Sequence, residues 1–215
     1  MAVRSTMQGI RRTHGKRKKQ AQPLLKDDLL ETLVLIDRQK PVKAARDRAL
    51  LLLGFAGAFR RSELVAVRIK DIKHVDSGVE IFLPHSKTDQ QREGDTKFIP
   101  CANGVRCPVL ALAEWLAVSG IESGFVFRAV DRHDNVSETA LTAQSVRLIV
   151  KKSVERVGGK KSAVSAHSLR SGYITQAAIA GHQIWQIKLV SLHNSDTVVS
   201  GYIRPINKRK VPSLL

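Results

Sequence analysis

The sequence predicts an α+β fold: a mainly helical domain that carries one small antiparallel β-sheet. With 215 residues, of which 43% are hydrophobic, the chain can bury the core of one sizeable domain. Most segments repeat apolar residues at helical spacing. From about residue 69 to residue 100 the pattern changes to short β-favouring runs separated by Asp, Ser and Gly. Because no internal repeat divides the chain, one mixed domain is the simplest description.

The first helices are expected between residues 25 and 67. In "LKDDLLETLVLIDRQ", Leu29, Leu33 and Ile36 recur at helical spacing, and two aspartates near the start suit the helix dipole. The next stretch, "PVKAARDRALLLLGFAGAF", opens on a proline and is apolar enough for a buried helix. A short helix, "RRSELVAV", should follow it.

The sheet is expected from three short runs, "RIKDIKHV", "GVEIFLP" and "TKFIP". A polar connection, "HSKTDQQREGD", separates the last two runs. Helices then resume in "PVLALAEWLAVSG", "TAQSVRLIVKKSVERVGG", "HSLRSGYITQAAIAGH" and "QIWQIKLVSL". Two of these end on glycine, a common helix stop. Asn194 or Ser195 can cap a last helix, with Asp196 in its first turn and Tyr202 inside it.

The charge of the chain indicates a polyanionic partner. Lys and Arg number 36 against 19 Asp and Glu, which gives a formal net charge of +17. Such a surface attracts phosphate backbones, although a ribosome-associated or simply basic protein would share the composition. Residues 1–25 form a concentrated basic arm, and the first acidic residue is Asp27. The candidate DNA-binding residues of this arm are Arg11, Arg12, Lys16, Arg17, Lys18 and Lys19.

We expect a soluble, intracellular protein, cytoplasmic and associated with the nucleoid if it is bacterial. No run approaches the roughly 18 apolar residues of a membrane span, and the basic N-terminus is not followed by the apolar stretch of a secretory signal. Cys101 and Cys107 fit small buried or loop positions. No neighbouring Cys or His cluster completes a tetrahedral zinc site, so no metal is expected.

Three stretches combine charged and apolar residues: "AFRRSEL", "AHSLRSGY" and "SLHNSDTVVSGY". Each has a plain structural explanation, since Arg60 could mark a solvated helix end and Tyr202 could be a core residue. His167 and Arg170 are three residues apart, which brings them to neighbouring positions on a helix. His193 and Tyr202 are nine apart and would lie on opposite faces of one unbroken helix. A break before the last helix is therefore required if both serve one site.

This ordered set resembles the tyrosine recombinase, or phage-type integrase, family over about residues 8–204. In that family an arginine stands before a Ser-Glu-Leu sequence and a lysine lies in a β-hairpin. A His-x-x-Arg box, a histidine and, nine positions on, a nucleophilic tyrosine follow. The matching residues here are Arg60, Lys87, His167, Arg170, His193 and Tyr202.

The resemblance implies an enzyme that breaks and rejoins DNA without cofactor or metal. Tyr202 would attack a phosphodiester, form a 3′-phosphotyrosyl link and release a 5′-hydroxyl. A phenol with a pKa near 10 is only about 0.1% ionised at pH 7, so phenolate formation costs about 4 kcal/mol. His167 would accept the phenol proton, while Arg60 and Arg170 would bind the non-bridging oxygens.

Further roles implied by the resemblance are less direct. Lys87 would protonate the departing 5′-oxygen, with Lys73 and Lys97 of the same sheet as rivals. His193 would donate a hydrogen bond to the phosphate, and Glu63 would orient the site residues from behind.

The chain also departs from the family pattern. Leu192 stands where glycine is usual, and Ser168 stands where aspartate is common. Tyr173 is a rival nucleophile, but its helical position three residues after Arg170 favours packing.

The expected organisation is a basic arm over residues 1–25, a catalytic domain over 26–204 and a C-terminal tail over 205–215. The helical DNA-clamping domain that family members usually carry at the N-terminus is not expected in this chain. The resemblance further implies a tetramer on DNA, with the tail docked on a neighbouring subunit. Two other functions fit the same features: a non-catalytic DNA-binding regulator derived from a recombinase, and a type IB topoisomerase.

Overall fold

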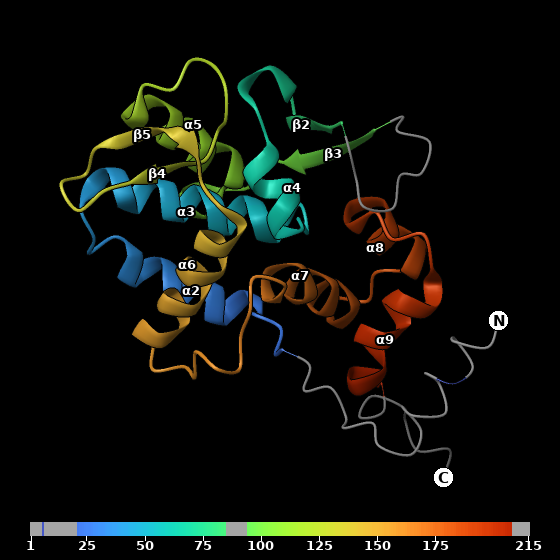
Figure 1. Cartoon of the computed structure of the whole chain (residues 1–215). Helices are drawn as coiled ribbons and strands as arrows, with labels where there is room; N and C mark the ends of the chain where they lie inside the picture. Colours follow the sequence, from blue (N-terminus) through green and yellow to red (C-terminus); the bar gives the residue numbers. More distant parts are fainter. Residues whose placement is uncertain (1–5, 7–20, 85–93, 208–215) are drawn as a thin grey trace, which may run out of the picture.

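The computed structural model describes residue 6, residues 21–84 and residues 94–207, with only the backbone for residues 105 and 204–207 (Figure 1). The candidate DNA-binding residues of the basic arm and Lys87 lie outside this described part. Within it, the α+β fold expected from the sequence is confirmed, with helices as the main component.

A long central helix, α3 (Pro41–Ala56), organises the larger part of the molecule. It begins at Pro41, as predicted, and packs on α5 (Pro108–Ser119) and on α2 (Lys26–Ile36). The helix α6 (Ala143–Arg156) packs against α2 and the short α4 (Arg61–Ala66). Their apolar faces form one main core, which includes Leu50, Leu51, Trp115 and Val150. This core is the frame on which the charged residues of the next subsection are mounted.

The predicted sheet is present and antiparallel, in the order β1 (Ile72–Val75), β2 (Gly78–Leu83) and β3 (Asp95–Pro100). Ile81 of β2 pairs with Lys97 of β3. A second hairpin, β4 (Arg128–Val130) and β5 (Val136–Ala140), was not predicted. Its strands are short, irregular in register and half-buried, so they lack the apolar alternation on which a strand prediction depends. Short 3₁₀ turns occur at Ile69–Asp71 and Gly104–Arg106.

The last three helices form a distinct lobe, drawn in brown to red in Figure 1. They are α7 (Ser168–Ile179), α8 (Ile184–Ser191) and α9 (Asp196–Asn207). Their shared apolar residues make a second, smaller cluster: Ile174, Ala177, Ile187, Val199 and Ile203. The predicted break between His193 and the last helix is confirmed, because α8 ends at Ser191, the following Leu192 is left-handed (φ 52°), and α9 begins at Asp196.

Packing extends further toward the N-terminus than the predicted boundary at residue 26. Leu24 is buried, and its amide donates to the carbonyl of Ser168 at 2.9 Å. The amide of Gln22 donates to the carbonyl of Ala163 at 2.7 Å. The end of the predicted arm is thus anchored beside α7. None of the described helices is both long and apolar enough to cross a membrane.

Candidate active site

Arg60 is fixed at the junction between the central helix and α4. The chain leaves α3 at Gly57, turns through Ala58 with φ 47°, and enters α4 with Arg60 at the N-cap. Glu63, which is buried, accepts a hydrogen bond from the Arg60 amide at 2.9 Å and forms an ion pair with its guanidinium group. Glu63 therefore contacts both the backbone and the side chain of Arg60, and its orienting role stays a prediction.

Arg170 lies in the first turn of α7 and is fully buried. Its Nη1 donates to the carbonyl of Ala58 at 2.7 Å, so the turn that positions Arg60 also holds Arg170. Burial and the nearby charge of Arg60 lower the pKa of Arg170 to about 10, which leaves it protonated at neutral pH. Among the described residues, its Nε has no hydrogen-bond partner although it is buried. The two guanidinium groups thus lie close enough for their charges to interact, and Arg170 retains a donor that no described residue uses.

His193 contacts Arg170 from the end of α8. The Nη2 of Arg170 lies 3.1 Å from its Nε2, and the hydroxyl of Ser191 lies 2.8 Å from its Nδ1. Burial, followed by the charges of Arg170 and Arg60, lowers the pKa of His193 to about 3, so the ring is neutral. Because arginine only donates, a ring nitrogen of the neutral His193 accepts from Nη2, which lies 3.3 Å from Nδ1 as well as 3.1 Å from Nε2.

Leu192 occupies the left-handed position just before His193. Glycine adopts this conformation without steric cost, which gives a physical reason for the glycine that is usual at the matching family position. Leucine is accommodated here by packing against the main core. The departure from the pattern therefore leaves the turn that presents His193 intact.

Tyr202 contacts His167 close to the two arginines. The phenol oxygen lies 2.7 Å from Nε2 of His167, a hydrogen-bond distance. Lost hydration, then the charges of Arg170 and Arg60, lower the pKa of His167, so its neutral ring can accept the phenol proton. Burial raises the pKa of Tyr202, while the two arginines oppose that rise. A protonated phenol and a neutral base therefore stand in contact at pH 7.

Lys97 also lies at this site, although the sequence suggested it only as an alternative to Lys87 for the general acid. It is 1% exposed, and its Nζ donates to the carbonyls of Gly57 at 2.8 Å and Val190 at 2.6 Å. Strand alternation was the available signal, because Lys97 shares the buried face of β3 with Ile99. Lys73 does not join the site, since its side chain is 76% exposed and lies beside Glu80.

The rival nucleophile Tyr173 packs edge-on against Phe55, with ring centroids 6.1 Å apart. Burial raises its pKa. Its neighbours among the described residues are apolar side chains of α3 and of the smaller cluster, which agrees with the packing role expected for it.

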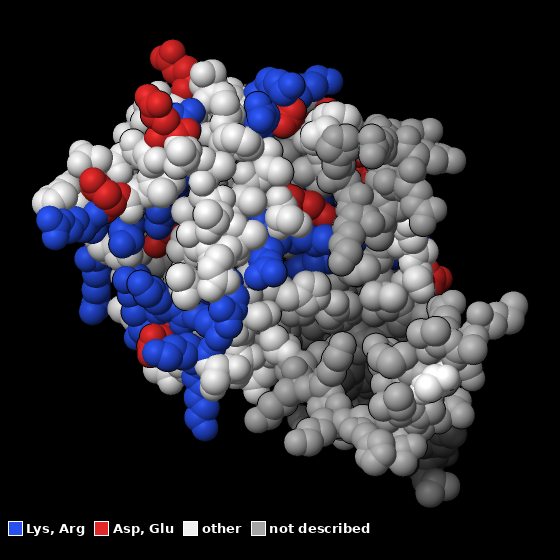
Figure 2. Space-filling view, in the orientation of Figure 1, with Lys and Arg blue, Asp and Glu red and all other residues white. Residues whose placement is uncertain are grey.

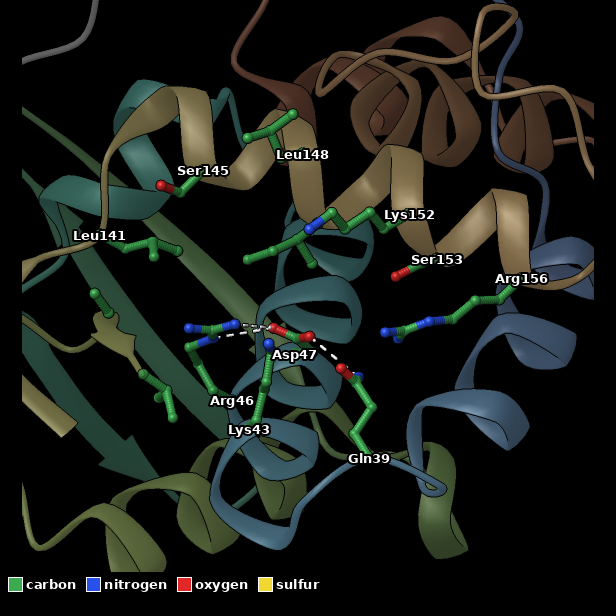
Figure 3. A pocket seen from close by; sticks show the side chains of 13 residues that line it. Gln39, Lys43, Arg46, Asp47, Leu141, Ser145, Leu148, Lys152, Ser153 and Arg156 are labelled. Carbon is green, nitrogen blue, oxygen red and sulfur yellow. Dashed lines mark hydrogen bonds and ion pairs between the residues drawn. The ribbon is translucent and has the colours of Figure 1, made fainter. Parts of the chain in front are cut away.

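Basic side chains also surround a cavity of about 230 Å³ between α3 and α6 (Figure 3). Figure 3 shows Lys43, Lys152 and Arg156 directed toward its centre. The buried Arg46 also lines it and is paired with Asp47 at 2.7 Å. In Figure 2, Lys and Arg side chains gather on the lower left of the described surface.

Comparison with known proteins identifies the family. The profile of the phage integrase family matches residues 10–209. The chain belongs to the phage integrase family. An integrase/recombinase xerD homologue from Selenomonas ruminantium is 39% identical over 206 residues, which cover 95% of this chain and 60% of that protein. The recombinase cre of Escherichia phage P1 is 25% identical, over 96% of this chain and 64% of that protein.

The fold of this family is also found among solved structures. The XerH site-specific recombinase, in a post-cleavage complex with palindromic difH substrate, superimposes with a TM-score of 0.70 at 18% identity. The match covers 91% of this chain and 54% of that one. The chain thus spans little more than half the length of XerH and less than two thirds of both curated relatives described above.

Proposed function

We propose that this chain is the catalytic part of a site-specific DNA recombinase that cleaves and rejoins strands through a 3′-phosphotyrosyl intermediate. The observation that carries the proposal is the 2.7 Å contact between the Tyr202 hydroxyl and the neutral ring of His167, beside the buried guanidinium group of Arg170 and the partly exposed one of Arg60. A phenol, a base and a paired cationic site are the groups that phosphoryl transfer to tyrosine requires. Family membership supports the same chemistry.

In the first step, the phenol oxygen of Tyr202 attacks phosphorus as its proton passes to Nε2 of His167. The bond between phosphorus and the 5′-oxygen breaks, and the departing oxygen takes a proton from a general acid, the role we assign to Lys87. A 5′-hydroxyl then attacks the phosphotyrosine in reverse, and the proton returns to Tyr202. Each step exchanges one phosphoester bond for another, so no cofactor is required.

Arg60 and Arg170 bind the non-bridging oxygens, where negative charge grows in the transition state. The free Nε of Arg170 and its Nη2 can form a paired contact with one phosphate. Because Nη2 contacts His193, the phosphate has to displace that contact. The hydroxyl of Ser191 can either accept or donate, so His193 can carry its proton on Nε2 and donate it to the phosphate.

Duplex DNA is the proposed partner, bound as a tetramer of this chain. The cations around the α3–α6 cavity, including Lys152 and Arg156, and the basic arm would supply phosphate contacts.

Tail residues 208–215, outside the described part, would dock on a neighbouring subunit. An apolar cavity of about 510 Å³, lined in part by Leu30, Phe55 and Phe98, could receive their "VPSLL" end. Deleting residues 206–215 should then abolish assembly on DNA, and unchanged assembly would refute the docking. Such an activity belongs in the cytoplasm, at the nucleoid in a bacterium.

Capture of covalent adducts tests the proposal without knowledge of the target site. The protein is incubated with fragmented genomic DNA at low salt and denatured with detergent, and the linked DNA is recovered and sequenced. Adducts should form with the wild type and with the matched control Tyr173→Phe, but not with Tyr202→Phe. Adduct ends at one sequence support a site-specific recombinase, whereas scattered ends indicate a topoisomerase. If the protein binds DNA in a salt-sensitive way but forms no adducts, even after the clamp domain of a relative is added, the result indicates a non-catalytic DNA-binding protein.

A further inference from the structure

Lys97 is a buried basic residue that the proposed chemistry does not use. Its side chain is among the largest that are fully buried, and its ammonium group lies 5.2 Å from the centre of the Phe59 ring. Burial lowers its pKa to about 7; Glu63 and Asp95 oppose this shift, while Arg170 and Arg60 add to it. Protonation of an amine in the interior next to two arginines costs folding free energy, so the presence of Lys97 here calls for a role that offsets this cost.

The two carbonyls that Lys97 binds belong to the two segments on which the catalytic arginines and His193 depend. Gly57 ends α3 and precedes Ala58, whose carbonyl holds Arg170 at 2.7 Å. Val190 lies in the last turn of α8, next to Ser191, which contacts His193 at 2.8 Å. These segments are about 130 residues apart in the sequence, and they also belong to different apolar clusters. One ammonium group therefore joins the main core to the lobe that carries the nucleophile.

We propose that Lys97 is a positioning residue, which sets the distance between Arg170 and His193 by fastening the turn before Arg60 to the end of α8. The inference rests on the proposed function for its consequence in catalysis. Direct proton donation to the leaving oxygen does not fit the geometry. The ammonium group is shielded from solvent and directed at two backbone carbonyls, and it would have to leave both to reach DNA.

The test compares Lys97→Met, which keeps the side-chain length but removes the charge and the donors, with Lys73→Met, an exposed lysine of β1. Both variants must show the wild-type circular dichroism spectrum. Single-turnover cleavage is measured on a duplex that carries the site recovered from the adducts. We expect Lys97→Met to cleave about 10- to 100-fold more slowly, with DNA affinity within about twofold, because misplaced supporting groups have effects of this size. Lys73→Met should cleave at the wild-type rate. A wild-type rate for Lys97→Met would overturn the inference.

A second substrate separates positioning from proton donation. In a duplex whose scissile 5′-bridging oxygen is replaced by sulfur, the leaving thiolate needs no general acid. A positioning residue should show the same decrease on both substrates. If the decrease for Lys97→Met disappears with the sulfur substrate, Lys97 acts on the leaving group and the positioning role is wrong.

A DNA-free measurement keeps the inference testable if the wild type forms no adducts and the proposed function fails. The ring signals of His193, identified by their loss in His193→Gln, are followed by NMR as the pH is lowered. In Lys97→Met they should shift, and their midpoint should rise from about 3, because the ring loses a neighbouring cation and its anchoring. Lys73→Met should leave them unchanged. Identical His193 signals in Lys97→Met and the wild type would exclude the positioning role whatever the DNA assays give.

Discussion

The two halves of the candidate site are held by structures of different strength. Arg60, Arg170 and Lys97 are mounted on the main core, where α3, α4, β3 and the start of α7 converge. Tyr202 is mounted on α9, which packs on a cluster of five buried residues shared with α7 and α8. Because the main cluster is much larger, we expect the cation-binding half to be the more rigid one and the nucleophile half, drawn in brown to red in Figure 1, to be the more weakly anchored lobe.

This difference matches what each half has to do in the proposed reaction. Groups that stabilise developing charge act best when they are fixed before the reaction, because no energy is then spent on moving them. The tyrosine instead becomes covalently attached to DNA and has to follow the strand it carries. A weakly anchored helix can move without disturbing the arginines. The comparison leads to four predictions, taken from the largest effect to the smallest.

Arg170→Lys should cause the largest loss, because it alters the rigid half. A lysine has a single ammonium group and cannot form the paired contact with phosphate. It also cannot bind the phosphate and the Ala58 carbonyl at the same time, as Arg170 can. We expect single-turnover cleavage to fall by about 10²- to 10³-fold, with DNA affinity changed only a few-fold. The exposed neighbour Arg61→Lys is the control. If the cleavage rate of Arg170→Lys decreases by less than tenfold, Arg170 does not contact the transition state.

The pH dependence of cleavage should report the base that contacts the nucleophile across the two halves. His167 must be neutral to accept the proton, and its pKa is lowered from 6.5 by lost hydration and by Arg170 and Arg60. The rate should therefore be independent of pH around neutrality and should fall about tenfold per pH unit below the pKa of His167. The measurement is a single-turnover pH profile on the wild type and His167→Gln. If the cleavage rate of His167→Gln decreases at acidic pH in the same way as that of the wild type, another group is the base.

The packing difference itself can be tested with two matched core valines. Val199 and Val150 are both fully buried, the first in the small cluster and the second in the main core. Each valine-to-alanine change should cost about 1–3 kcal/mol. Hydrogen exchange should accelerate only in α8 and α9 for Val199→Ala, but throughout the protein for Val150→Ala. Equal, global acceleration in both variants would show that the lobe and the core unfold together.

Much of this site was predictable from the sequence, and the missing parts share one cause. Arg60, His167, Arg170, His193 and Tyr202 follow the family spacing, and the structure brings all five together. The break between His193 and Tyr202 follows from helix geometry alone. Lys97 was not assigned, because a lysine in a short strand usually faces solvent, and its alternation with the apolar Ile99 was a weaker signal than that general preference. The hairpin of β4 and β5 was missed for the same reason, since half-buried strands leave no clear pattern.

Leu192→Gly should have the smallest effect and tests how the end of α8 presents His193. Glycine removes the steric cost of the left-handed conformation, about 1 kcal/mol, but adds backbone entropy to the unfolded chain and loses the packing of leucine on the main core. These contributions oppose one another, so the free energy of unfolding should change by less than about 1 kcal/mol in either direction. Leu192→Ala, which keeps the steric cost and loses the packing, should be less stable than Leu192→Gly in urea denaturation. If the alanine variant is instead the more stable, the left-handed turn is not what limits this position, and His193 is held mainly by Ser191 and Arg170.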